Sequence, residues 1–234
     1  MDITPEQRTY ARLAGIMYLL KFVLEGVGDG ITIISRGSST FAETARWAAE
    51  SAQLYRVALV QVAAAWVATA ILAFALYIVL EPVNKRLAQL ALFLRLGASF
   101  VGAASVMLRV AQLRLYQAST TEGLFTTEQL HTLVSVSQRA SSAGVTIAWM
   151  FLGAGGVLFF ILFLRSRYLP RALAGFGLVT SALVVAMGIA TFVFPERTNA
   201  FKLFLLPALL ADIATGVWLL FKGLQARAPA EARA

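Results

Sequence analysis

Six long apolar stretches follow one another along the chain, separated by polar connections. Each stretch reaches the roughly 20 residues that an α-helix needs to cross a hydrocarbon core of about 30 Å. We therefore predict an all-α fold, a polytopic membrane protein built as a bundle of six transmembrane helices. The predicted helices cover residues 11–34, 54–80, 87–115, 143–164, 172–194 and 203–221. The connections are too short for a separate soluble module, so residues 1–234 are predicted to form a single transmembrane domain, with 223–234 as a short flexible tail.

The two longer connections, residues 35–53 and 116–142, each contain a helix-start signal. The signals are capping-box patterns, Thr40-x-x-Glu43 and Thr126-x-x-Gln129. In a capping box the first side chain accepts a hydrogen bond from the backbone three residues on, and the last side chain returns one. The connections are therefore predicted to contain either short interfacial helices or extensions of the second and fourth membrane helices.

The composition supports a membrane protein. Hydrophobic residues make up 59% of the chain, charged residues make up 14%, and the mean hydropathy is +0.75. A soluble domain is usually about 45–50% apolar and about 25% charged, so the additional apolar side chains must face lipid. The lipid bilayer is thus the first predicted partner.

The net charge of +8 comes from cations at the ends of the predicted helices. Since none of them forms a patch of the kind that binds phosphate backbones, no nucleic acid partner is predicted. The chain has no cysteine and one histidine, which excludes a thiolate nucleophile, an iron–sulfur cluster and a haem held by two histidines of one chain. No cofactor and no metal site are predicted, and the sequence identifies no protein partner.

The cations also predict the orientation of the helices. An even number of crossings places both termini on one side, where ten Lys and Arg residues are concentrated near the helix ends. The opposite side carries seven, spread over longer connections. Because short cytoplasmic connections are enriched in Lys and Arg, both termini are predicted to be cytoplasmic.

Six charged residues lie inside the predicted helices, three of each sign. They are Lys21, Arg95 and Arg109, and Glu25, Asp29 and Asp212. A charge at the bilayer centre costs about 2.5–3.5 kcal/mol on insertion scales, so such residues usually face the interior of a bundle and find partners. The equal numbers indicate that these residues pair with one another.

The depth of these residues indicates which of them meet. Counted from the basic residue at the inner end of each helix, Lys21, Arg95 and Asp212 lie nine or ten residues inside, or roughly 13–15 Å. Glu25 lies one turn beyond Lys21, within reach of it. We predict a buried polar cluster of Lys21, Glu25, Arg95 and Asp212 that joins the first, third and sixth helices near the membrane midplane.

Asp29 and Arg109 are predicted to form a second layer, nearer the outer surface. Arg109 follows Arg95 by 14 residues, a rotation of about 320°, so both lie on a similar face of the third helix. Three roles are open for these charges. They could hold the helices in register, bind a ligand, proton or lipid headgroup, or line a cavity filled with water.

The leading functional hypothesis is a non-enzymatic membrane protein that binds or moves a small amphiphile or ion. Asp212 would be the acidic partner, Arg95 and Lys21 the cationic ones, and Glu25 would modulate Lys21. A second hypothesis is an enzyme that acts on a lipid-borne substrate at the outer face, with candidate residues His131, Glu128 and Arg139. A third is a structural or assembly subunit of a membrane complex. Enzyme activity is the less favoured interpretation, and no catalytic residue is predicted.

Four blocks of the sequence occur in an order typical of one family. They are residues 12–20 (RLAGIMYLL), 76–84 (LYIVLEPVN), 168–171 (YLPR) and 206–212 (LPALLAD). In these blocks the chain resembles the bacterial membrane family catalogued as domain of unknown function 4386, over residues 12–223. The resemblance implies a six-helix integral protein of the bacterial inner membrane and carries no activity or catalytic residue. Family members often have Gly-Glu where this chain has Ala211 and Asp212, an acid one methylene shorter.

Overall fold

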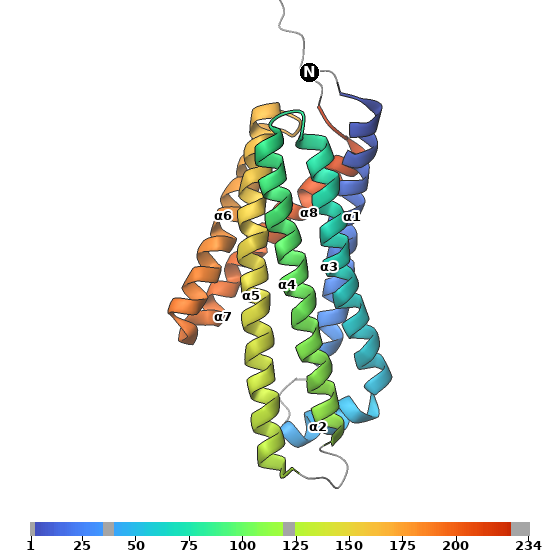
Figure 1. Ribbon diagram of the computed structural model, residues 1–234, viewed down its shortest axis with the longest axis vertical. Coiled ribbons are helices and arrows are strands. Elements are labelled where there is room, and N and C mark those ends of the chain that lie inside the picture. Colours follow the sequence, from blue (N-terminus) through green and yellow to red (C-terminus); the bar gives the residue numbers. More distant parts are fainter. Residues whose placement is uncertain (1–2, 35–39, 119–124, 226–234) are drawn as a thin grey trace, which may run out of the picture. The chain divides into compact units, whose positions relative to one another are not determined.

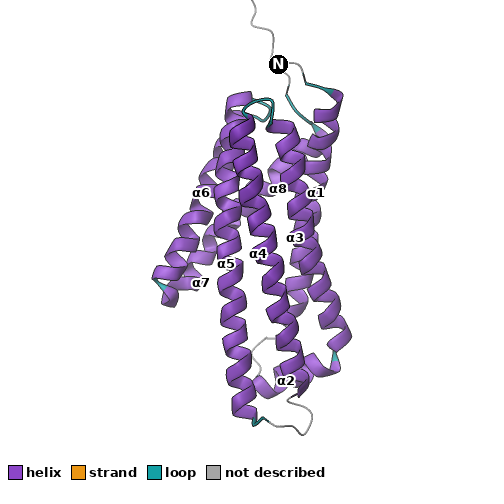
Figure 2. Cartoon of the chain, viewed as in Figure 1, coloured by secondary structure: helices purple, strands orange, loops and turns teal. Residues whose placement is uncertain are grey.

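The protein is helical throughout the part that the structure describes. The computed structural model describes residues 3–34, 40–118 and 125–225, and every regular element in these ranges is a helix (Figure 2). The α-helices are α1 (Pro5–Ile34), α2 (Phe41–Glu50), α3 (Ala52–Leu80), α4 (Lys85–Ala118), α5 (Thr127–Ser166), α6 (Arg171–Val193), α7 (Thr198–Phe201) and α8 (Leu205–Phe221) (Figure 1). Two short 3₁₀ helices flank α7, η1 (Pro195–Arg197) and η2 (Lys202–Phe204). The prediction of an all-α fold is confirmed; residues 226–234 of the predicted tail lie outside the described residues.

Four of these helices are long and apolar enough to cross a membrane: α3, α4, α5 and α6. A fifth span results if Pro195–Phe201 and Leu205–Phe221, which meet at an angle of 41°, count as one broken crossing. α1 is long enough, but Lys21, Glu25 and Asp29 interrupt its apolar sequence. The described helices therefore indicate a membrane-embedded, multi-pass protein with four to five apolar spans, fewer than the six predicted.

Both capping boxes form, with different consequences. The backbone N–H of Thr40 donates to Glu43 Oε2 at 2.8 Å and the N–H of Glu43 donates to Thr40 Oγ1 at 3.4 Å, which starts the short helix α2. The corresponding distances for Thr126 and Gln129 are 2.9 and 3.3 Å, and there the helix runs on without a break for 40 residues as α5. The first connection thus contains a separate helix and the second extends the predicted fourth helix.

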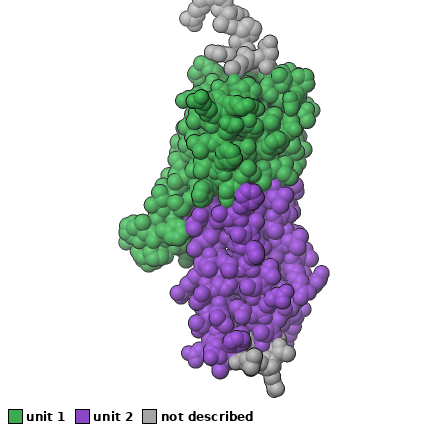
Figure 3. Space-filling view, in the orientation of Figure 1, with its two compact units in different colours: residues 1–19, 68–98, 149–234 green, residues 20–67, 99–148 purple. Residues whose placement is uncertain are grey.

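The chain divides into two compact units (Figure 3). Unit 1 comprises residues 1–19, 68–98 and 149–234, and unit 2 comprises residues 20–67 and 99–148. Because α1, α3, α4 and α5 contribute residues to both units, neither is a separate stretch of sequence. Each unit has its own interior.

The interior of unit 1 is largely apolar and is built by α1, α3, α4, α5, α6 and α8. Leu72, Leu76, Phe163 and Leu219 are completely buried in it. A buried glutamine, Gln7, is accommodated because its Nε2 donates to the carbonyl of Val79 at 3.0 Å and lies 3.4 Å from the Tyr168 hydroxyl. These contacts tie the start of α1 to the end of α3 and to the turn before α6.

Both units also carry large apolar side chains on their outer surfaces. In unit 1 Phe93 and Phe221 are 68% and 76% exposed, and in unit 2 Phe100 and Met107 are 70% and 73% exposed. A soluble protein rarely exposes so many large apolar side chains in helices, since water makes such surfaces costly. These surfaces fit contact with lipid tails.

Candidate functional site

Arg95 is the largest completely buried side chain of unit 1. It lies on α4 and is 2% exposed. Its guanidinium carbon is 5.7 Å from the centroid of the Phe159 ring on α5, a distance at which a ring face attracts a cation. A buried charge is costly unless it is paired and hydrogen-bonded, so the residues around Arg95 form the first candidate site.

Two glycines of α5 make room for the Arg95 side chain. A Cβ atom on Gly155 would lie 2.7 Å from Arg95 Cγ and 3.0 Å from the carbonyl oxygen of Ala91. A Cβ atom on Gly156 would lie 3.2 Å from Arg95 Nη2. Since these distances are shorter than ordinary van der Waals contacts, α5 can pack directly on the arginine only where it has no side chains.

Tyr18 of α1 and Asp212 of α8 complete this site in unit 1. Tyr18 is completely buried, its hydroxyl accepts a hydrogen bond from Arg95, and Asp212 acts on it electrostatically. Sequence reasoning missed Tyr18, because a tyrosine in an apolar helix is an ordinary packing residue. The signal that could have identified it is its position one turn after Gly15.

Gly15 and Gly216 bring α1 and α8 close enough to form the site. A Cβ atom on Gly15 would lie 2.6 Å from the backbone nitrogen of Leu220 and 2.8 Å from the carbonyl oxygen of Gly216. A Cβ atom on Gly216 would lie 2.7 Å from Tyr18 Cβ. Asp212 precedes Gly216 by one helical turn, so the contact between the two glycines positions the acid beside Tyr18.

The four residues of the predicted midplane cluster are divided between the units. Arg95 and Asp212 belong to unit 1, while Lys21 and Glu25 belong to unit 2. Lys21 is 4% exposed, and its Nζ atom lies 4.6 Å from the centroid of the Phe22 ring. A single cluster of all four residues stays a prediction.

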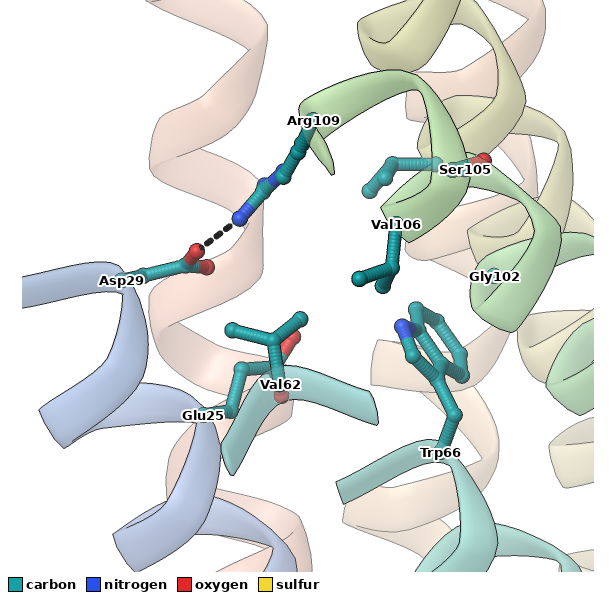
Figure 4. A pocket seen from close by; sticks show the side chains of 9 residues that line it. Glu25, Asp29, Val62, Trp66, Gly102, Ser105, Val106 and Arg109 are labelled. Atoms are coloured by element: carbon teal, nitrogen blue, oxygen red, sulfur yellow. Dashed lines mark hydrogen bonds and ion pairs between the residues drawn. The ribbon is translucent and has the colours of Figure 1, made fainter. Parts of the chain in front are cut away.

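A second candidate site lies in unit 2, around the residues of the predicted outer layer. Arg109 Nη1 of α4 donates to Asp29 Oδ1 of α1 at 2.5 Å (Figure 4). Both side chains are partly buried, at 18% and 33% exposed. The structure therefore joins α1 and α4 of this unit through an ion pair.

The ion pair borders a small pocket. Besides Asp29 and Arg109 its lining includes Glu25, Trp66 and Ser105, and Figure 4 shows Trp66 packed beneath Gly102. The cavity volume is about 10 Å³, which is close to the minimum for one water molecule. The pocket thus combines two carboxylates and one guanidinium around a space that can hold about one water molecule.

The residues proposed for an outer-face enzyme lie on the first turns of α5. Glu128, His131 and Arg139 are all exposed, and the His131 ring packs 5.0 Å from the Phe41 ring of α2. Arg139 lies eight residues beyond His131, about 12 Å further along the helix. The three side chains do not converge on one point. Among the described residues no group of three His, Cys, Asp or Glu could hold a metal ion.

Comparison with known proteins places this architecture in a family. No curated protein and no solved structure matches the chain. The family described as Domain of unknown function (DUF4386) matches residues 13–223, which include Tyr18, Arg95 and Asp212. A match over this much of the sequence shows that the chain belongs to the DUF4386 family.

Proposed function

We propose that the protein crosses a bacterial inner membrane six times and binds or moves a small ion or amphiphile at the site formed by Tyr18, Arg95 and Asp212. The observation that carries the proposal is the complete burial of Arg95 in contact with Tyr18. Charged residues inside membrane proteins commonly mark the paths of ions and substrates, since a charge without a role is expensive to keep there.

The sixth crossing in this proposal is α1. Its 30 residues measure about 45 Å, more than the hydrocarbon core requires. Two of its charges are not exposed to lipid as bare ions, because Lys21 is buried and Asp29 is paired with Arg109. α8 and the segment Pro195–Phe201, which meets it at a bend, form the fifth crossing. Six crossings place both termini on one side of the membrane. The greater density of cations near the termini favours a cytoplasmic location for both of them.

The chemistry of the site supports an ion more than a bulky ligand. Arg95 supplies the guanidinium cation of the site, and the carboxylate oxygens of Asp212 can accept a second cation as a ligand. A cation bound at Asp212 would change the electrostatic effect that Asp212 and Arg95 together have on the Tyr18 hydroxyl. The close packing of Gly155 and Gly156 on Arg95 leaves little room for a larger group.

Native mass spectrometry of the protein released from mild detergent tests the proposal. The wild type is compared with Asp212→Asn and with Asp29→Asn, a matched loss of one acid in unit 2. The unfolding temperature of the same three proteins is also measured in a panel of salts and at a series of pH values. We expect an adduct, or a stabilising ion, that the wild type and Asp29→Asn retain and Asp212→Asn loses.

Two results would contradict the proposal. One is a folded Asp212→Asn protein with the same adducts and the same ion response as the wild type. The other is a wild type with neither adduct nor ion response, and an Asp212→Asn variant that differs only by a lower unfolding temperature. The second result would mean that the charges hold helices in register, a role that buried polar pairs also fill.

A further inference from the structure

Several polar groups in the interior of unit 2 have no hydrogen-bond partner among the described residues. They are the Tyr55 hydroxyl, Gln61 Oε1, and both Oε1 and Nε2 of Gln112. Tyr55 and Gln112 are each only 1% exposed. Buried polar groups nearly always have a partner in the protein or in ordered water, so a set of such groups in one unit requires an explanation.

The helix register places Tyr55 and Gln112 at the same level. Trp66 of α3 packs on α4 at Gly102, where a Cβ atom would lie 2.2 Å from the indole ring. α3 and α4 are antiparallel. Tyr55 lies eleven residues before Trp66 on α3, and Leu113 lies eleven residues after Gly102 on α4. Eleven residues are close to three whole turns, so Leu113 lies opposite Tyr55, and Gln112, the residue before it, lies at the same level.

Gln61 and the ion pair lie between this level and Trp66. Gly28 of α1 packs on α3 beside Gln61, because a Cβ atom there would lie 3.3 Å from Gln61 Cβ. Asp29 is the next residue of α1, and its partner Arg109 lies one turn before Gln112 on α4. The unpartnered groups therefore follow one another along unit 2, starting from the pocket of Glu25, Asp29 and Arg109.

We propose that unit 2 binds a chain of internal water molecules, which starts at this pocket and continues past Gln61 to Gln112 and Tyr55. Water fits because the groups include donors and acceptors, and water supplies both. The pocket volume of about 10 Å³ matches one such molecule and is too small for a headgroup or an organic ligand. The chain gives the carboxylates of Glu25 and Asp29 access to water inside an apolar unit. This site involves none of the unit 1 residues of the proposed function.

Radiolytic footprinting of the full-length protein in lipid nanodiscs tests this proposal. X-ray pulses split bound water into hydroxyl radicals, which add to aromatic rings in direct contact with that water, and mass spectrometry locates the added oxygen. We expect modification of Tyr55 and Trp66 in the wild type. Phe160 and Phe163 serve as dry controls, since they are equally buried in the apolar interior of unit 1.

Gln112→Leu tests the chain itself, because leucine keeps the approximate size of the side chain and removes both amide atoms. We expect it to abolish the modification of Tyr55, while Gln53→Leu, at an exposed position of the same unit, leaves it unchanged. If Gln112→Leu does not fold, Tyr55→Phe removes only the hydroxyl at the end of the chain, and modification at position 55 should fall to the level of Phe160 and Phe163.

Two outcomes would overturn the proposal. In the first, Tyr55 and Trp66 of the wild type are modified no faster than Phe160 and Phe163, and Gln112→Leu raises the unfolding temperature, as removal of an unsatisfied amide from a dry interior should. In the second, the aromatic residues are modified but neither Gln112→Leu nor Tyr55→Phe changes the pattern. Water would then reach the unit by a route that does not involve these groups.

Discussion

Replacing Gly15 by alanine adds a single methyl group at the closest approach of two helices. The new carbon would meet only backbone atoms: the nitrogen of Leu220 at 2.6 Å, the carbonyl oxygen of Gly216 at 2.8 Å and the Cα atom of Leu220 at 3.0 Å. Backbone atoms cannot turn aside as a flexible side chain can, so α1 must move away from α8. Overpacking of a core costs about 1–3 kcal/mol.

The same substitution also has a stabilising effect, because alanine favours a helix over glycine by about 0.5–1 kcal/mol. The net expectation for Gly15→Ala is a loss of about 1–2 kcal/mol in the free energy of unfolding. Gly175 of α6 is the matched control, since a Cβ atom there has nothing within 4 Å. Gly175→Ala should therefore show only the stabilising effect.

Unfolding in mixed micelles with increasing fractions of sodium dodecyl sulfate, followed by far-ultraviolet circular dichroism, measures both variants. We expect opposite signs for Gly15→Ala and Gly175→Ala. A Gly15→Ala protein at least as stable as the wild type would refute this expectation, because α1 and α8 would then not be in backbone contact. The placement of Tyr18 beside Asp212 would lose its basis as well.

Three further predictions concern charge and capping. Arg95→Met should cost about 3–5 kcal/mol, because it removes the cation that offsets Asp212 at the buried Tyr18. Adding Asp212→Asn should recover part of the loss in the same titration, and strictly additive losses would contradict the coupling. Thr40→Ala removes the side-chain cap of α2 and should destabilise that helix by about 1 kcal/mol, seen as faster amide exchange in α2 but not in α3. The hydrogen bond from Lys85 holds the pKa of the Glu81 carboxyl below its ordinary 4.5. The contribution of this bond to stability is present above pH 4.5 and is lost as the pH falls through the lowered pKa. Glu81→Gln should therefore reduce the acid sensitivity of unfolding, and an unchanged pH profile would count against this expectation.

The helix starts could be predicted because their signals are local. Thr40 with Glu43, and Thr126 with Gln129, each need only four consecutive residues to satisfy backbone groups that a helix start leaves without partners. The length of the helix beyond such a start is not determined locally. Whether a polar segment forms a short helix such as α2 or continues into a membrane helix such as α5 depends on the elements that pack beside it, which the sequence does not contain.

The partners of the buried charges could be predicted only in part. Counting residues along a helix gives the level of a side chain and its angle around its own axis. It does not say which neighbouring helix that angle faces. Residue counting put Arg109 at the outer level of Asp29, and the structure joins the two in an ion pair. Depth alone gave no means of including Tyr18.

The number of spans shows the same limit. When helices are judged by composition alone, every charged residue counts against a membrane crossing. By this criterion α1 is not one of the apolar spans. Whether such a charge is costly depends on its neighbours in three dimensions: Asp29 is compensated by an arginine that lies 80 residues away in the sequence.

The uninterrupted length of α5 offers a practical tool for locating the bilayer. Its 40 residues measure about 60 Å, whereas about 20 residues suffice to cross the hydrocarbon core, so roughly half of the helix extends beyond it. The whole chain contains no cysteine, so one introduced thiol carries a fluorophore or spin label without competition. Labels at exposed positions such as His131, Val136 and Ile147 would lie on one stiff rod at known spacings. Quenching by lipid-bound or aqueous agents along this rod then serves as a ruler that records where water ends and lipid begins.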